Sequence, residues 1–309
     1  MAKYSCEECD NEMILNDIKN KFRLVNAYED WKDYRLLLTD TVIEAGGGDS
    51  TKTLSVIGAG YCNDIDIRRL SAAFEKIYLV DCDTEALVET ARKSREEFCG
   101  ALVVAGSCDY DVDKIDLKPI SLTGIYEADV SAYFEDTLTT LREQGSKLNY
   151  EVFIEIFTSK LDVLYEKLIT NENDLADQLP HSDIILCNGV CSQLFSMISF
   201  FIRSVAGSIP DSLFRDAMQA ADIVEQKLKN ASEAVIPVIC KALLKSANCV
   251  IFGNEYNKDH PVEGAQCCID TIRQSGSIIK EIEATWSFNC HENVEYNMLL
   301  QICKRMRNK

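Results

Sequence analysis

The chain has 309 residues, of which 47% are hydrophobic, so it can bury a large core in one elaborated domain or in two. Its 32 Lys and Arg against 50 Asp and Glu give a formal net charge of −18, which repels phosphate backbones and argues against nucleic acid as a substrate. The longest uncharged apolar stretch, around residues 190–202, is too short to cross a bilayer, so we expect no membrane partner. The chain has fourteen cysteines, begins MAKYSCEECD and has no apolar signal segment at this start. Because a secreted, disulfide-rich chain would need such a segment, we expect reduced thiols and a cytoplasmic protein.

The first fifty residues have the pattern of a helical N-terminal cap. Apolar side chains recur at helical spacing over residues 10–44, with Trp31, Tyr34 and Leu38 on one stripe, and a glycine-rich connector follows. Cys6 and Cys9 have the spacing of metal ligands, but no second Cys or His pair accompanies them, so we predict no metal site.

Residues 53–83 form the most informative segment, because they follow the order strand, glycine turn, helix, strand, acid. A short apolar run ends at Gly58, Ala59 and Gly60, where the missing side chains let a ligand approach the backbone at the start of a helix. The helix is expected over residues 65–74 and the next strand over 77–80. Asp81 ends that strand, where its carboxylate can accept both hydroxyl hydrogens of a ribose.

This order predicts a site for a nucleotide-like cofactor, and the alternative is a purely structural turn. Asp64, just before the expected helix, is open to two interpretations: it can favour the helix start, or it can contact the ligand.

The middle of the chain holds an uncertain third strand and a long helical segment. Residues 84–98 predict a helix, and the third strand is either 101–105, which we prefer, or 115–122. Residues 126–180 lack strand character and have apolar side chains at helical spacing, so they predict a helical insertion.

The last third of the chain returns to strands. Residues 183–188 and 249–252 are solid apolar runs, separated by helical segments over 192–206 and 211–244. Residues 294–302 instead alternate between apolar and polar, and with residues 285–290 they predict an antiparallel hairpin. The predicted fold is therefore α/β: a Rossmann-like three-layer αβα sandwich around a mostly parallel seven-stranded sheet with a C-terminal antiparallel hairpin.

This order of elements resembles that of the class I S-adenosylmethionine-dependent methyltransferases, over about residues 51–309. The resemblance implies a methyltransferase domain at 51–309, a helical cap at 1–50 and a helical insertion at about 126–180. It also implies S-adenosylmethionine as cofactor. The implied cofactor-binding residues are Gly58, Ala59 and Gly60 at the methionine part, Asp81 at the ribose, Asp109 at the adenine if the third strand is 101–105, and Asn188 and Gly189 with Val190 at the methyl-transfer cavity.

Two departures from the family pattern concern the glycine turn. Val56 stands where many members have an acid, and Cys62 stands where many have a third glycine. A third departure is at the end of the fourth strand, where Asn188 is not followed by the Pro-Pro-aromatic sequence of enzymes that methylate base amino groups, and Cys191 lacks the preceding proline of cytosine C5 methyltransferases. These absences agree with the net charge in disfavouring a base-modifying enzyme.

The resemblance implies methyl transfer to a small molecule or, as second choice, to a protein side chain. Transfer from a sulfonium is an in-line displacement, so a general base is needed only if the acceptor arrives protonated. The candidates for such a base are Glu255, Tyr256, His260 and His291, although the simpler interpretation of each one alone is a surface or packing residue.

Helices from residues 1–50 and 126–180 are expected to build the acceptor pocket. Two alternatives remain: a nicotinamide-dependent oxidoreductase, whose fingerprint has a glycine where this chain has Asn63, and a non-catalytic module that binds S-adenosylmethionine.

Overall fold

The structure is a computed structural model that describes residues 18, 20, 24–92, 114–257 and 262–305. These residues separate into two compact units. The sheet unit comprises residues 25–122, 170–192 and 236–309, and the helical unit comprises 1–24, 123–169 and 193–235, in each case as far as they are described. No helix among the described residues is long and apolar enough to span a membrane.

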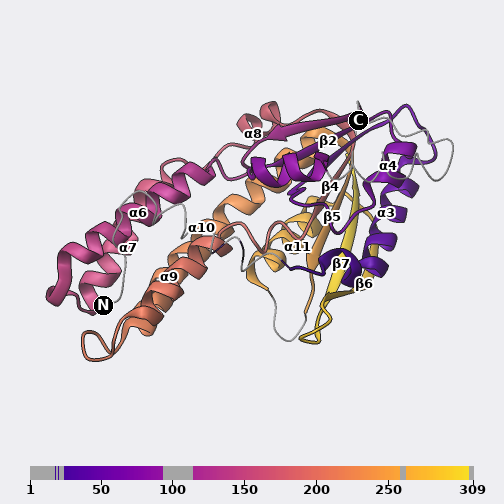
Figure 1. The fold of residues 1–309 in the computed structure, drawn as a ribbon. Coiled ribbons are helices and arrows are strands. Elements are labelled where there is room, and N and C mark those ends of the chain that lie inside the picture. The colour runs from indigo at the N-terminus through magenta and orange to yellow at the C-terminus, as the bar shows by residue number, and fades with distance from the viewer. Residues whose placement is uncertain (1–17, 19, 21–23, 93–113, 258–261, 306–309) are drawn as a thin grey trace. The chain divides into compact units, whose positions relative to one another are not determined.

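The sheet unit is built on one seven-stranded sheet in the order β3-β2-β1-β4-β5-β7-β6 (Figure 1). Strands β1 to β5 are parallel, while β7 is antiparallel to both β5 and β6. The predicted mostly parallel sheet with a terminal hairpin is thus confirmed. The strands are β1 (Thr53–Ile57), β2 (Lys76–Asp81), β3 (Ile115–Pro119), β4 (Ser182–Asn188), β5 (Ala247–Glu255), β6 (Ile278–Asn289) and β7 (Val294–Lys304).

Helices cover both faces of this sheet, which makes the three-layer sandwich. Figure 1 shows α3 and α4 on one side of the sheet and α11 on the other. The helices of the sheet unit that lie wholly within the described residues are α2 (Ala27–Asp30), α3 (Lys32–Gly46), α4 (Ile67–Ala73), α8 (Glu172–Gln178), α11 (Glu263–Ser275) and the last part of α10 (Ala217–Ser246). Residues 84–92 are also helical.

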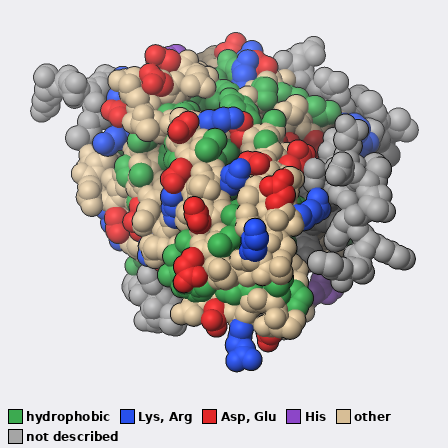
Figure 2. Space-filling view, turned by 90° about the vertical axis from the view of Figure 1, so that its left-hand side faces the viewer, with side chains coloured by type: hydrophobic (Ala, Val, Ile, Leu, Met, Phe, Trp, Pro, Cys, Tyr) green, Lys and Arg blue, Asp and Glu red, His purple; other side chains and the backbone are tan. Residues whose placement is uncertain are grey.

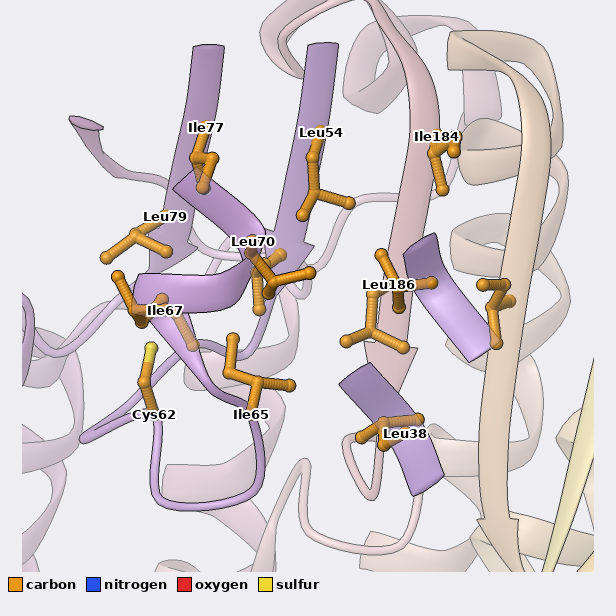
Figure 3. Packing of buried hydrophobic residues seen from close by; sticks show 14 of the residues in the cluster. Leu38, Leu54, Cys62, Ile65, Ile67, Leu70, Ile77, Leu79, Ile184 and Leu186 are labelled. Carbon is orange, nitrogen blue, oxygen red and sulfur yellow. The ribbon is translucent and has the colours of Figure 1, made fainter. Parts of the chain in front are cut away.

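The core on the α3 and α4 side follows from the register of the strands. Leu54 of β1 lies between Ile77 of β2 and Ile184 of β4, so their side chains form one apolar row. Leu38 and Leu70, both fully buried, bring the two helices onto this face (Figure 3). The same register places the carboxyl ends of β1, β2, β4 and β5 along one edge of the sheet.

The third strand is Ile115–Pro119, the second of the two candidates, and it pairs in parallel with β2. The preference for residues 101–105 as this strand is therefore wrong, and those residues lie outside the described part of the chain. The physical reason is that β3 is at the edge of the sheet, where a strand is only half covered. Asp116, which pairs with Lys76 and Lys118, suits such an edge, whereas a solid apolar run is typical of a central strand.

The helical unit contains α6 (Glu127–Gln144), the short 3-10 helix η2 (Gly145–Lys147), α7 (Tyr150–Tyr165), α9 (Ser196–Ser208) and the first part of α10. Its core is aromatic: Phe134 stacks on Phe201 with ring centroids 4.0 Å apart, and Phe153 packs against Phe157 at 4.5 Å. Helices therefore occupy the segment 126–180 where the sequence predicts them. The unit also includes residues 193–235, which the sequence pattern does not separate from the sheet.

One face of the molecule mixes charges of both signs (Figure 2). Figure 2 shows Asp and Glu interspersed with Lys and Arg over the face turned to the viewer, with no patch made only of basic side chains. This agrees with the excess of 50 acidic over 32 basic residues in the whole chain.

Candidate cofactor site at the carboxyl edge of the sheet

The glycine turn after β1 lies over the end of β2. The backbone N–H groups of Gly58 and Ala59 both donate to the carbonyl oxygen of Val80, at 2.8 and 3.2 Å. Gly58 has a φ of 67°, and a Cβ there would lie 2.4 Å from Cγ2 of Val190, so both the backbone and the close approach of a side chain require glycine. Gly60 also has a positive φ, 46°, but a Cβ there would meet nothing within 4 Å. The second glycine is therefore the one whose backbone borders open space.

Asp81 joins this turn to the end of β2. Its Oδ2 accepts a hydrogen bond from the backbone N–H of Gly60 at 2.8 Å, and its Oδ1 accepts one from that of Asp83 at 2.9 Å. Burial raises the pKa of the Asp81 carboxyl, and the two N–H donors partly offset this. A carboxylate oxygen has more than one lone pair, so each oxygen can still accept a hydroxyl hydrogen of a ribose.

Asn188, at the end of β4, bridges two other segments of the chain. Its Oδ1 accepts from the hydroxyl of Tyr34 in α3 at 2.6 Å, and its Nδ2 donates to Oδ2 of Asp64 at 2.7 Å. The N-cap of α4 is Asp66, whose carboxylate accepts from the N–H of Arg69, so Asp64 does not cap this helix. Burial raises the pKa of Asp64, while Asn188 lowers it. The Asn188 amide is thus already engaged by the protein.

Glu255 is the last residue of β5. Among the base candidates that the structure describes, it is the one with a buried side-chain oxygen that has no hydrogen-bond partner. Its side chain is 8% exposed, and Oε1 accepts a hydrogen bond from the hydroxyl of Ser192 at 2.9 Å. Its Oε2 is buried and has no hydrogen-bond partner. Burial raises the pKa of the Glu255 carboxyl, and its own backbone N–H and Ser192 lower it.

The other base candidates lie elsewhere. Tyr256 lines an open pocket of about 430 Å³ beside the hairpin, together with Glu283, Thr285 and Asn297. His291 is exposed in the turn between β6 and β7, where its Nε2 lies 2.9 Å from Nδ2 of Asn26. His260 lies outside the described residues, as does Asp109.

An aromatic cluster adjoins the carboxylates. The ring of Tyr34 stacks on Trp286 with centroids 5.1 Å apart, and Tyr296 packs edge-on against Phe288 at 5.0 Å. Tyr34 is 2% exposed, as expected if its stripe is part of the core. Burial raises the pKa of Tyr34, and the charges of Asp64 and Glu255 raise it further. No local pattern in the sequence indicates this meeting of α3, β4, β5 and the hairpin.

The residues present fit the adenosine end of S-adenosylmethionine. Gly60 offers backbone facing open space, and Asp81 beside it offers carboxylate oxygens with free lone pairs. The predicted residues Gly58, Ala59, Gly60, Asp81, Asn188 and Gly189 lie at one edge of the sheet. At Gly58 and Asn188, however, the nearest partners are side chains of the protein itself.

The sequence matches no known protein family model, and no curated protein is similar to it in sequence. Among solved structures, it is similar to the N-methyltransferase NodS from Bradyrhizobium japonicum, with 8% identity and a TM-score of 0.44 over 92% of this chain and 99% of that one. NodS has also been solved in complex with S-adenosyl-L-homocysteine. A precorrin-6y C5,15-methyltransferase from Geobacter metallireducens follows at 8% identity, with a TM-score of 0.40 over 87% of each chain.

At such identities and TM-scores these likenesses carry no argument, and the fold assignment depends on the sheet itself. The strand order and the antiparallel closing hairpin make this a Rossmann-like α/β fold.

Proposed function

We propose that this protein is an S-adenosylmethionine-dependent methyltransferase that acts on a small molecule. The observation that supports this most is the hydrogen bond from the Gly60 N–H to Asp81, which joins the glycine turn to an acid at the carboxyl end of the neighbouring strand. In open α/β sheets, ligands bind beyond the carboxyl ends of the strands, where the strand order reverses. Here the order reverses between β1 and β4, next to this pair.

Each residue has a task in this proposal. Asp81 holds the ribose hydroxyls, and the backbone at Gly60 borders the nucleoside. When bound, the cofactor supplies a methyl group on a positively charged sulfur. Because the reaction is an in-line displacement, most of the catalysis comes from positioning. Tyr34 and Asp64 hold Asn188, and so fix the chain that leaves β4 at the edge of the site.

A thermal melting screen tests the cofactor. Binding to the folded state alone stabilises it by about 2.7 kcal/mol at a ligand concentration about 100 times Kd. We expect S-adenosylmethionine and S-adenosylhomocysteine to raise Tm, and NAD+ and NADH to leave it unchanged. Asp81→Asn should remove most of this shift.

Asp116→Asn is the matched control, since it removes the same charge from the neighbouring strand β3, outside the site. A shift with the dinucleotides alone identifies an oxidoreductase and refutes the proposal, and so does the absence of a shift with any of the four ligands. Stabilisation by S-adenosylmethionine without methylation of any acceptor in an amine, alcohol, thiol and carboxylate panel identifies a non-catalytic binding module.

A further inference from the structure

The unpaired oxygen of Glu255 calls for a hydrogen-bond donor. Buried polar atoms in folded proteins nearly always have a partner, because desolvating one without compensation is costly. Glu255 is more than nine-tenths buried, and Ser192 satisfies only one of its two oxygens. The described residues therefore leave a position at Oε2 for a water molecule or for a donor group of a ligand.

The surroundings of Glu255 favour a donor with a positive charge. Among the described residues, the groups that shift its pKa include no Lys or Arg. Asp64 also lacks an ion pair among the described residues. Burial raises the pKa of Tyr34, and the charges of Asp64 and Glu255 both raise it further, so the two carboxylates lie near the same tyrosine. Arg35, the base that lowers the pKa of Asp64, donates to the carbonyl oxygens of Tyr28 and Asn63. Two acids thus share one region in which the described residues provide little compensating charge.

Aromatic rings complete these surroundings. Glu255 pairs with Met298 of β7, two residues from Tyr296 on the same strand. Burial raises the pKa of Tyr34 and of Tyr296, and the charge of the nearby Glu255 raises both further. Tyr34 stacks on Trp286, and Trp286 in turn packs edge-on against Tyr296 with centroids 6.3 Å apart. Aromatic faces attract cations and also bury the apolar part of a ligand.

We propose that Oε2 of Glu255 binds the ammonium group of the methyl acceptor, so that the acceptor is a small primary or secondary amine. This inference rests on the proposed methyltransferase function and specifies its substrate class. One N–H of the ammonium donates to Oε2. That proton then moves to the carboxylate: the N–H bond breaks, an O–H bond forms, and the electron pair stays on nitrogen as the nucleophile. Glu255 is thereby both the binding group and the base for the acceptor.

Calorimetric titration of the full chain with matched probes tests this. The probes are benzylamine, butylamine and ethanolamine, with benzyl alcohol and benzoate as the neutral and anionic counterparts of the first. We expect at least one amine to bind, benzyl alcohol to bind at least tenfold more weakly than benzylamine, and benzoate not to bind. Glu255→Gln should weaken amine binding at least tenfold and leave the affinity for S-adenosylhomocysteine unchanged.

Glu283→Gln is the control for charge, because Glu283 is an exposed acid of β6 that lines the neighbouring open pocket. If Glu255→Gln does not fold, Glu255→Asp keeps the charge but withdraws it by one methylene, and it should weaken amine binding severalfold. Equal binding of benzylamine and benzyl alcohol, equal effects of the two Gln variants, or no binding by any amine overturns the inference. S-adenosylhomocysteine in the same titrations separates the two claims: if it binds and the amines do not, only the substrate class fails.

Discussion

Gly253 in β5 provides the sharpest test of the site geometry. A methyl group there would lie 2.0 Å from Oδ1 of Asn188 and 3.0 Å from Cδ2 of Leu300. Gly253→Ala must therefore displace the Asn188 side chain and break its hydrogen bonds with Tyr34 and Asp64. Overpacking costs about 1–3 kcal/mol, and leaving a buried polar group unpaired costs about 1–3 kcal/mol more. We expect the free energy of unfolding to fall by about 2–6 kcal/mol.

Tryptophan fluorescence during urea unfolding measures this change where it occurs. The chain has two tryptophans, Trp31 and Trp286, and both belong to the sheet unit. With a denaturant slope of about 2–3 kcal/mol per molar urea, the midpoint should fall by about 0.7–3 M. Asn188→Ala removes the obstacle, so in that background Gly253→Ala should cost less than about 1 kcal/mol, which corresponds to a coupling of about 1 kcal/mol or more.

The double-mutant cycle also shows how the reasoning can fail. If Gly253→Ala is as destabilising with Ala at position 188 as with Asn, then Asn188 is not the obstacle. In that case the hydrogen-bonded chain from Tyr34 through Asn188 to Asp64 does not hold the end of β4.

Three further predictions concern other parts of the chain. Burial raises the pKa of Glu255, so its contribution to stability is present below the unfolded pKa and is lost as the pH rises through the folded pKa. Urea midpoints should therefore show Glu255→Gln more stable than the wild type at about pH 8 and equal to it at about pH 4. Equal midpoints at both pH values would contradict this. Gly207 lies in α9, where an added methyl group would meet nothing within 4 Å. Gly207→Ala should therefore stabilise the helical unit by up to about 1 kcal/mol, measured by unfolding followed by circular dichroism. A loss of stability would show that the position is not open. The neighbouring thiol of Cys191, and then burial, raise the pKa of both Cys240 and Cys268, whose sulfurs are 3.5 Å apart. Iodoacetamide followed by mass spectrometry should therefore label the exposed Cys82 and Cys290 long before this pair, and labelling of the pair at a similar rate would refute the burial.

Local pattern is enough to predict the strand, turn and acid that frame the first half of the candidate site. The strand, turn and acid from residue 53 to 81 are continuous in sequence, and each step has a signal in a single residue type, such as glycine for a positive φ or an apolar run for a buried strand. The alternation in the last strand likewise predicted the hairpin. Apolar content favours residues 101–105 as the third strand, but a solid apolar run is typical of a strand buried on both faces. The actual β3 lies at the edge of the sheet and is only partly buried, so its sequence is more polar.

The second half of the site could not be predicted from local pattern. Tyr34 and Asn188 are 154 residues apart, and Asn188 and Asp64 are 124 apart, so nothing in their neighbourhoods indicates that they meet. Glu255 was one of several base candidates, with no more support from the sequence than Tyr256. It is distinguished only by burial and by an oxygen without a partner, and both depend on what the rest of the chain packs around it.

The two glycines of the turn carry different weight as evidence for a ligand. At Gly58 the positive φ and the contact with Val190 together explain the missing side chain, so this glycine would be needed even if nothing bound there. At Gly60 the positive φ disfavours a side chain, yet a Cβ there would meet nothing within 4 Å. The N–H of Gly60 donates a hydrogen bond to Asp81. A purely structural turn needs the first glycine and the hydrogen bonds to Val80, but it does not need an acid with free lone pairs next to open space. The case for a nucleoside in this fold therefore depends on Gly60 and Asp81 together.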